Sequence, residues 1–290
     1  MPPGSLPRGR GARALPAQGR AGLPHFRARV ATDMRADQLL VERGLATSRS
    51  QAQRLIAGGM RWLAREGWKP VAKNGDELPA DCEIELQDAA EARYVSRGGL
   101  KLEGALRASG VEVAGRLCLD VGQSTGGFTD CLLQHGAVRV VGVDVGHGQL
   151  HPRIREDARV ACFEGVNARH LTAADLPEPE SNPAYAFITG DLSFISLTLV
   201  LPALAPLLAI DGDLLMLVKP QFELQPGQVG KGGIVRDAAL HDEVQARVRA
   251  ACEALGLQVA GWFDSPIAGG DGNREFFIHA RRRDDPGSDR

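Results

Sequence analysis

Two ionisable residues, Asp191 and Lys219, stand at the ends of apolar runs and have the side chains needed to act on a hydroxyl group. Asp191 ends the run 186–191, and Lys219 follows the run 213–218. A lysine at the mouth of a buried strand is costly unless it is paired, and Asp191 on a neighbouring strand could pair with it. Lys219 could then accept or direct the proton that a hydroxyl group loses as it attacks an electrophile. The alternative is a salt bridge with only a structural role.

Two further charged residues could converge on this pair. Lys101 ends the segment Tyr94-Val-Ser-Arg-Gly-Gly-Leu-Lys101, and Glu275 opens the last apolar run of the chain. Lys101 would be a second cation close to Lys219.

The segment Cys118–Asp130 has the pattern of a cofactor-binding corner. An apolar strand, 117–121, leads into a glycine-bearing turn and then into a helix that we expect Ser124 or Thr125 to cap. The glycine spacing is not the G-x-G-x-x-G of pyrophosphate binders, and a carboxylate at the strand end would repel a pyrophosphate. The carboxylate would suit a ligand with an ammonium and a sulfonium, so the corner favours S-adenosylmethionine over NAD. Such turns also occur without a ligand. The expected cofactor contacts here are Asp120, Gly122, Ser124, Thr125, Gly126 and Gly127.

Two later residues are further candidates for contacts with this cofactor. Asp144 closes the apolar run Val140-Val-Gly-Val-Asp144, where an acid could accept hydrogen bonds from two ribose hydroxyls. Asn167 follows the next run and could approach an adenine ring.

From residue 93 onward, apolar strand-like runs alternate with helical patterns. This alternation predicts an α/β fold with a doubly wound, largely parallel, Rossmann-like sheet and its ligands at the carboxyl ends of the strands. The last two runs have no helix between them, so we expect the final strand to be reversed, which gives a mixed sheet. The uncharged stretch 193–210 contains two prolines and is short for a membrane span, so we expect a buried helix there. The predicted strands are 117–121, 138–143, 159–163, 186–191, 213–218, 257–263 and 275–280.

The chain divides by pattern into four parts. Residues 1–33 are rich in Pro, Gly and Arg and lack an apolar signal region, so we expect disorder or an extension ahead of a natural start at Met34. Residues 34–92 predict a small α+β module with helices at 36–43 and 49–57. Residues 93–282 hold the larger α/β domain, and 283–290 form a tail that we expect to be disordered.

Charge is distributed locally rather than over the whole chain. The net charge is −2, but residues 35–73 carry eight Arg or Lys against three acids. This basic face predicts an oriented contact with nucleic acid, while solvated helix faces are the alternative. A glycine-rich loop at 220–236 could close over the nucleic acid. The candidate RNA contacts are Arg35, Arg43, Arg49, Arg54, Arg93, Arg97, Lys231 and Arg236, of which we expect Arg93 and Arg97 to lack nearby acids.

The five cysteines are scattered, with no C-x-x-C pair and no histidine cluster. Neither a metal site nor a disulfide framework is indicated, and a reducing cytoplasm fits this usage.

Six runs of sequence resemble a known family. The amino-terminal run Arg35–Ile56 is similar to the S-four RNA-binding domain. The later runs resemble the TlyA family, ribosomal RNA cytidine 2′-O-methyltransferases that are often labelled hemolysins and have an FtsJ-like catalytic domain. Gln123 stands where the family usually has Ala, and Leu192 where it has Val. The TlyA-like runs are 94–106, 120–134, 191–196, 218–223 and 229–237.

The resemblance implies a function, a cofactor and a partner. It implies S-adenosylmethionine-dependent methylation of a cytidine ribose, with ribosomal RNA or ribosomal subunits as partner and no membrane. Its catalytic tetrad falls on Lys101, Asp191, Lys219 and Glu275. Asp191 would orient Lys219, and Glu275 would hold Lys101 or the ribose. A membrane-active hemolysin and a non-catalytic RNA-binding protein are the alternatives.

Overall fold

The computed structural model describes residues 33–86, 93–176 and 185–283. Within these ranges a mixed sheet of seven strands has the order β11-β12-β10-β9-β6-β7-β8. The predicted Rossmann-like architecture is therefore confirmed, as are all seven predicted strands, although β10 begins at Leu208 and not at residue 213. The strands are β6 Leu117–Val121, β7 Arg139–Asp144, β8 Val160–Glu164, β9 Tyr185–Gly190, β10 Leu208–Val218, β11 Leu257–Asp264 and β12 Phe276–Arg282.

The direction of the last strand brings distant parts of the sequence to one edge of the sheet. The pairs β6–β7, β6–β9, β7–β8 and β9–β10 are parallel, whereas β12 runs antiparallel to β10 and β11. Val218, the last residue of β10, lies opposite Phe276, the first of β12. Lys219, which follows β10, and Glu275, which precedes β12, therefore lie at the same edge, where the parallel strands end. The strand order reverses at β6, and this switch point is where such sheets bind ligands.

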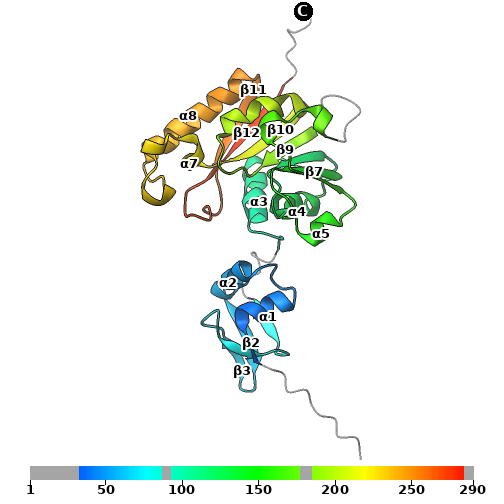
Figure 1. The fold of residues 1–290 in the computed structure, drawn as a ribbon, viewed down its shortest axis with the longest axis vertical. Coiled ribbons are helices and arrows are strands. Elements are labelled where there is room, and N and C mark those ends of the chain that lie inside the picture. Colours follow the sequence, from blue (N-terminus) through cyan, green and yellow to red (C-terminus); the bar gives the residue numbers. More distant parts are fainter. Residues whose placement is uncertain (1–32, 87–92, 177–184, 284–290) are drawn as a thin grey trace, which may run out of the picture.

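Helices cover both faces of the sheet. α8 (Ala238–Ala254) packs in one buried layer, and α3 (Gly98–Ser109) packs with α4 (Gly127–Gln134) in the other (Figure 1). α8 begins after its cap residue Asp237, whose carboxylate accepts a hydrogen bond from the Ala239 amide at 3.0 Å. The remaining helices of this domain are short: α5 Pro152–Arg155, α6 Leu201–Leu204 and α7 Pro220–Glu223.

Two local predictions are wrong. The stretch 193–210 forms no single helix: it holds the 3₁₀ turns η4 (Leu197–Leu199) and η5 (Ala205–Leu207), the four-residue α6 and the start of β10. Pro202 and Pro206 lack the amide donors that a continuous helix would need. The helix after the glycine turn begins at Gly127, and its cap is Gly126 with φ 92°, not Ser124 or Thr125.

The amino-terminal part is a small α+β unit with its own core. Helices α1 and α2 pack over two small sheets, with strand orders β1-β4 and β3-β2-β5. Ser48 caps the predicted helix 49–57, because its Oγ accepts a hydrogen bond from the Gln51 amide at 3.2 Å. The Thr47 hydroxyl and the Gln51 amide donate to the carbonyls of Val95 and Tyr94 and so link this unit to the larger domain. Its elements are β1 Asp33–Arg35, α1 Ala36–Glu42, α2 Arg49–Ala57, β2 Met60–Ala64, β3 Gly67–Pro70, β4 Glu77–Pro79 and β5 Ile84–Leu86.

Predictions for the two ends of the chain fall almost wholly outside the described residues, which begin at Asp33 and end at Arg283. In the part that is described, no helix combines the length and the apolar character needed to cross a membrane.

Candidate active site

The four charged residues of the predicted tetrad lie in one chain of ion pairs. Lys219 Nζ is 2.5 Å from Asp191 Oδ1, and Lys101 Nζ is 3.6 Å from Asp191 Oδ2. Lys101 Nζ also lies 2.6 Å from Glu275 Oε2. Positive and negative groups alternate along this chain, so each charge is offset by a neighbour.

Each of these side chains is placed by a different element. Asp191 follows β9 and Lys219 follows β10, so adjacent parallel strands deliver them to the same edge of the sheet. Glu275 precedes β12 and reaches this edge because that strand is reversed. Lys101 projects from the first turn of α3, which lies far ahead of Asp191, Lys219 and Glu275 in the sequence.

Burial separates the tetrad into an inner and an outer pair. The side chains of Lys101 and Glu275 are 6% and 2% exposed, compared with 11% for Lys219 and 25% for Asp191. Burial raises the pKa of Glu275, and the adjacent Lys101 ammonium opposes that rise. Lys101, Asp191 and Lys219 line the neighbouring cavity, but Glu275 does not. Glu275 therefore contacts Lys101 without itself lining the cavity.

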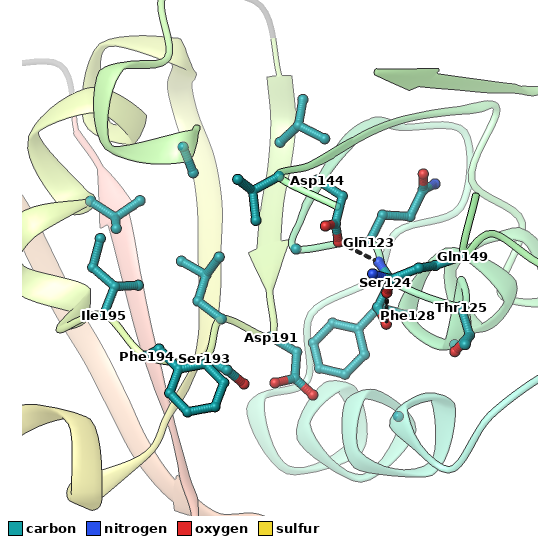
Figure 2. A pocket seen from close by; sticks show the side chains of 18 of the residues that line it. Gln123, Ser124, Thr125, Phe128, Asp144, Gln149, Asp191, Ser193, Phe194 and Ile195 are labelled. Atoms are coloured by element: carbon teal, nitrogen blue, oxygen red, sulfur yellow. Dashed lines mark hydrogen bonds between the residues drawn. The ribbon is translucent and has the colours of Figure 1, made fainter. Parts of the chain in front are cut away.

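The cavity extends from this tetrad to the glycine turn after β6 (Figure 2). Its volume is about 640 Å³, within the range of small-molecule sites. At its far end the Asp144 carboxylate accepts hydrogen bonds from the Ser124 amide at 2.7 Å and the Gly146 amide at 2.6 Å. Predicted cofactor contacts that line it are Gly122, Ser124, Thr125, Gly127, Asp144 and Asn167.

Two predicted cofactor contacts lie outside the cavity lining. Asp120 is fully buried in β6, where its carboxylate accepts a hydrogen bond from the Thr129 hydroxyl at 2.6 Å. Burial raises the pKa of this carboxyl to about 7. The expectation that Asp120 faces the ligand is therefore not met. Gly126 instead caps α4, and its left-handed φ turns the chain from the loop into the helix.

Two residues of the Asp191 loop were not identified as site residues from the sequence. Ser193 Oγ accepts a hydrogen bond from Lys219 Nζ at 2.8 Å. Phe194 is 90% exposed at the cavity, has φ 64° and packs near Phe222 with a ring-centroid distance of 5.1 Å. In the view of Figure 2, both lie beside Asp191, across the cavity from Ser124 and Phe128. An aromatic residue three positions after the charged strand end at Asp191 is the signal that could have identified Phe194.

The predicted RNA contacts are in different surroundings. Arg97 lines the cavity, and its guanidinium donates to the Ala268 carbonyl. Arg93, expected to lack a nearby acid, pairs with Glu103, so that expectation is wrong. Lys231 and Arg236 are exposed on the loop between α7 and α8.

Basic residues of the amino-terminal unit also make internal contacts. Arg35 and Arg49 both pair with the buried Asp37 at 3.0 Å. Arg43 donates to the carbonyls of Ala80 and Cys82. Arg54 lies in the last turn of α2. At least three of these side chains therefore also hold the unit together.

A Rossmann-like sheet of this strand order, with a cavity at its switch point, is typical of S-adenosylmethionine-dependent methyltransferases. Residues 94–282 match the family of FtsJ-like methyltransferases. A candidate rRNA methyltransferase of Bacillus subtilis, YqxC, is 45% identical over 247 residues, 84% of each chain. The 16S/23S rRNA (cytidine-2′-O)-methyltransferase TlyA of Mycobacterium tuberculosis is 44% identical over 252 residues, 87% of this chain and 91% of the relative.

A solved structure of a candidate hemolysin from Streptococcus thermophilus is also similar. It is 41% identical, has a TM-score of 0.66, and the match covers 88% of this chain and 90% of that one. The chain belongs to the TlyA family of FtsJ-like methyltransferases.

Proposed function

We propose that this protein transfers a methyl group from S-adenosylmethionine to the 2′-hydroxyl of a cytidine ribose in ribosomal RNA. The observation that carries the proposal is the Lys219–Asp191 ion pair at the edge of the cofactor cavity. A ribose hydroxyl is a weak nucleophile at neutral pH, so it needs a group that takes its proton. The relatives named rRNA methyltransferases support ribosomal RNA as the substrate class.

The residues lining the cavity fit S-adenosylmethionine. The glycine-bearing loop leaves backbone close to the cavity, and a Cβ at Gly122 would lie 2.7 Å from the Asp191 carbonyl oxygen. Asp144 presents a fixed carboxylate for ribose hydroxyls, and Asn167 lines the same cavity. When bound, the cofactor supplies a methyl group on a sulfonium, and its leaving group departs neutral.

The tetrad would remove the proton of the 2′-hydroxyl and would hold the reacting groups in position. As a neutral amine, Lys219 accepts the proton of the 2′-hydroxyl, and the ammonium that results is held by Asp191 and Ser193 through two contacts. Lys101 holds the second oxygen of Asp191, and Glu275 anchors Lys101. In-line displacement at the methyl carbon then depends mainly on holding the two reactants in line.

The surroundings of the cavity support an RNA substrate. Arg97 offers a cation for a phosphate, and Phe194 offers an exposed ring on which a base can stack. The amino-terminal α+β unit would bind structured RNA beyond the target nucleotide. We place the reaction on ribosomal subunits in the cytoplasm, with the loop 220–236 closing over the RNA.

Mapping of ribose methylation tests this proposal. Ribosomal RNA from cells with and without the gene is compared for 2′-O-methyl sites. The proposal predicts a cytidine that is methylated only when the gene is present, and re-expression of the Lys219→Ala variant should not restore it. Identical methylation maps would overturn the substrate assignment.

A further inference from the structure

Gln123, which stands in the middle of the cofactor loop, has its side chain folded under the loop rather than into solvent. It is 3% exposed, and its amide Nε2 donates a hydrogen bond to Thr129 Oγ1 at 2.8 Å. The Thr129 hydroxyl in turn donates to Asp120 Oδ2. Two successive hydrogen bonds thus join the loop to α4 and to β6.

The amide of Gln123 occupies space that a glycine on the next strand leaves free. Gly142 lies on β7, directly opposite Asp120 on β6. A Cβ at Gly142 would lie 2.0 Å from Gln123 Cδ and 2.1 Å from its Nε2. Atoms do not approach this closely, so any side chain at position 142 would displace the Gln123 amide. Gln123 and Gly142 are matched in size.

The loop above this contact needs such an anchor because its backbone is strained. Ser124 has φ 48°, in the left-handed region that non-glycine residues rarely occupy. The Gly122 and Gln123 amides both donate to the Val143 carbonyl, and the Ser124 amide donates to Asp144. These three bonds attach the loop to β7, whereas the Gln123 side chain attaches it to α4 through Thr129.

We propose that Gln123 is a positioning residue that, paired with Gly142, fixes the loop Gly122–Gly126 in the conformation that binds S-adenosylmethionine. The inference rests on the proposed function only in that this loop receives the methyl donor. Gln123 lines the cavity and also fixes the loop backbone through its hydrogen bond to Thr129, so it sets cofactor affinity rather than the chemistry at the ribose.

Cofactor titration of single and double variants tests the pairing. The dissociation constant for S-adenosylmethionine is measured by calorimetry without RNA for the wild type, Gln123→Ala, Gly142→Ala and the double variant. Gly142→Ala should weaken binding more than about tenfold, and Gln123→Ala about three- to tenfold. The double variant should bind better than Gly142→Ala alone, because the new methyl group enters the space that Gln123 vacates.

Two further variants separate packing from hydrogen bonding. Gln123→Met keeps the length of the side chain but loses the bond to Thr129, and it should fall between Gln123→Ala and the wild type. At saturating cofactor, Gln123→Ala should keep kcat within about twofold, which a general loss of structure would not allow. If Gly142→Ala does not fold, the double variant must fold and bind within about threefold of Gln123→Ala.

Additive losses in the double variant, or wild-type affinity in Gly142→Ala, would overturn the inference. Because these titrations contain no RNA, a wild type that binds the cofactor but methylates no RNA would refute the proposed substrate alone.

Discussion

At the scale of single residues, the site depends on how one lysine is held. Lys219 has contacts with both Asp191 and Ser193, so its ammonium has a defined position at the cavity. The sequence predicted the pairing with Asp191 because both residues end apolar runs. It could not predict Ser193, since the path of the loop after Asp191 depends on tertiary packing.

Replacing Lys219 should remove the chemistry and leave cofactor binding. The variant Lys219→Ala loses the group that takes or directs the hydroxyl proton, and a positioned base is worth roughly 10²–10⁴-fold in rate. We expect single-turnover methyl transfer to fall by at least that range while the dissociation constant for S-adenosylmethionine stays within about threefold. Near-normal methyl transfer by this variant would refute the role of Lys219.

Asp120 should make stability depend on pH in a defined window. Its pKa is raised from 3.8 to about 7 in the folded protein, mainly by burial. Between these two values the unfolded chain releases a proton that the folded protein retains, so stability is lost as pH rises through the window. The variant Asp120→Asn has no such proton, so relative to the wild type it should gain about 1–4 kcal/mol between pH 4 and pH 8. Urea unfolding at both pH values measures this, and a pH-independent difference between the two proteins would contradict it.

At the scale of elements, α7 holds the loop that carries Asp191. Glu223 on α7 is buried, and its carboxylate accepts hydrogen bonds from the Ser196 hydroxyl at 2.5 Å and the Leu197 amide at 2.7 Å. Burial raises the pKa of Glu223. Lys219 immediately precedes α7, so one short helix positions both members of the proposed catalytic pair.

Loss of the Glu223 carboxylate should therefore affect catalysis from a distance. Glu223→Ala leaves the Ser196 hydroxyl and the Leu197 amide without their acceptor, which frees the Asp191 loop. We expect kcat to fall about 10- to 100-fold, because a small displacement of a reacting group is enough for such a loss. Glu223→Gln is the matched control: its amide oxygen can accept from Leu197 and its nitrogen can donate to Ser196 Oγ, so it should keep most of the activity. Equal losses in both variants would refute this positioning role.

The elements themselves were largely predictable, because buried strands appear in the sequence as apolar runs. The helix α8 lies between a capping residue, Asp237, and a glycine, Gly256. The orientation of Asp120 was not predictable. A central parallel strand is buried on both faces, so the sequence does not show which face a polar residue takes. Glu223 also escaped prediction, since its partners lie 26 and 27 residues earlier in the chain and meet it only in the folded domain. In the stretch 193–210, apolar composition favoured one helix, but its two prolines interrupt the helical hydrogen bonds and leave only short turns.

At the scale of the whole molecule, the amino-terminal unit presents the hairpin β2–β3, which carries basic and aromatic residues, away from the seven-stranded sheet (Figure 1). On its surface Trp68 is 39% exposed and lies opposite Leu63, and the Arg61 guanidinium is 5.8 Å from the Trp68 ring centroid. Exposed rings beside guanidinium groups suit unpaired RNA bases. The sequence predicted a basic face here, but the exposure of the tryptophan depends on the strand register.

We expect Trp68→Ala to raise the KM for RNA without changing the affinity for S-adenosylmethionine. Base stacking on an aromatic ring is worth about 1–3 kcal/mol, which corresponds to roughly 5- to 150-fold in binding. The control is Ile210→Ala, which removes an exposed apolar side chain near the opposite end of β10 from the site. Steady-state methylation of ribosomal subunits at varied RNA concentration measures both. An unchanged KM for RNA in Trp68→Ala would exclude the hairpin from substrate binding.

Alkaline hydrolysis of labelled RNA tests most directly whether the Lys219–Asp191 pair directs a methyl group to a ribose hydroxyl of ribosomal RNA. Purified protein is incubated with unmethylated ribosomal subunits and radiolabelled S-adenosylmethionine, and the labelled RNA is then hydrolysed with alkali. A 2′-O-methyl group blocks cleavage of the adjoining phosphodiester, so we expect label in an alkali-resistant dinucleotide that begins with cytidine. Label recovered in mononucleotides would place the methyl group on a base, and no label at all would deny the reaction. Either result would contradict 2′-O-methylation of ribosomal RNA by this protein.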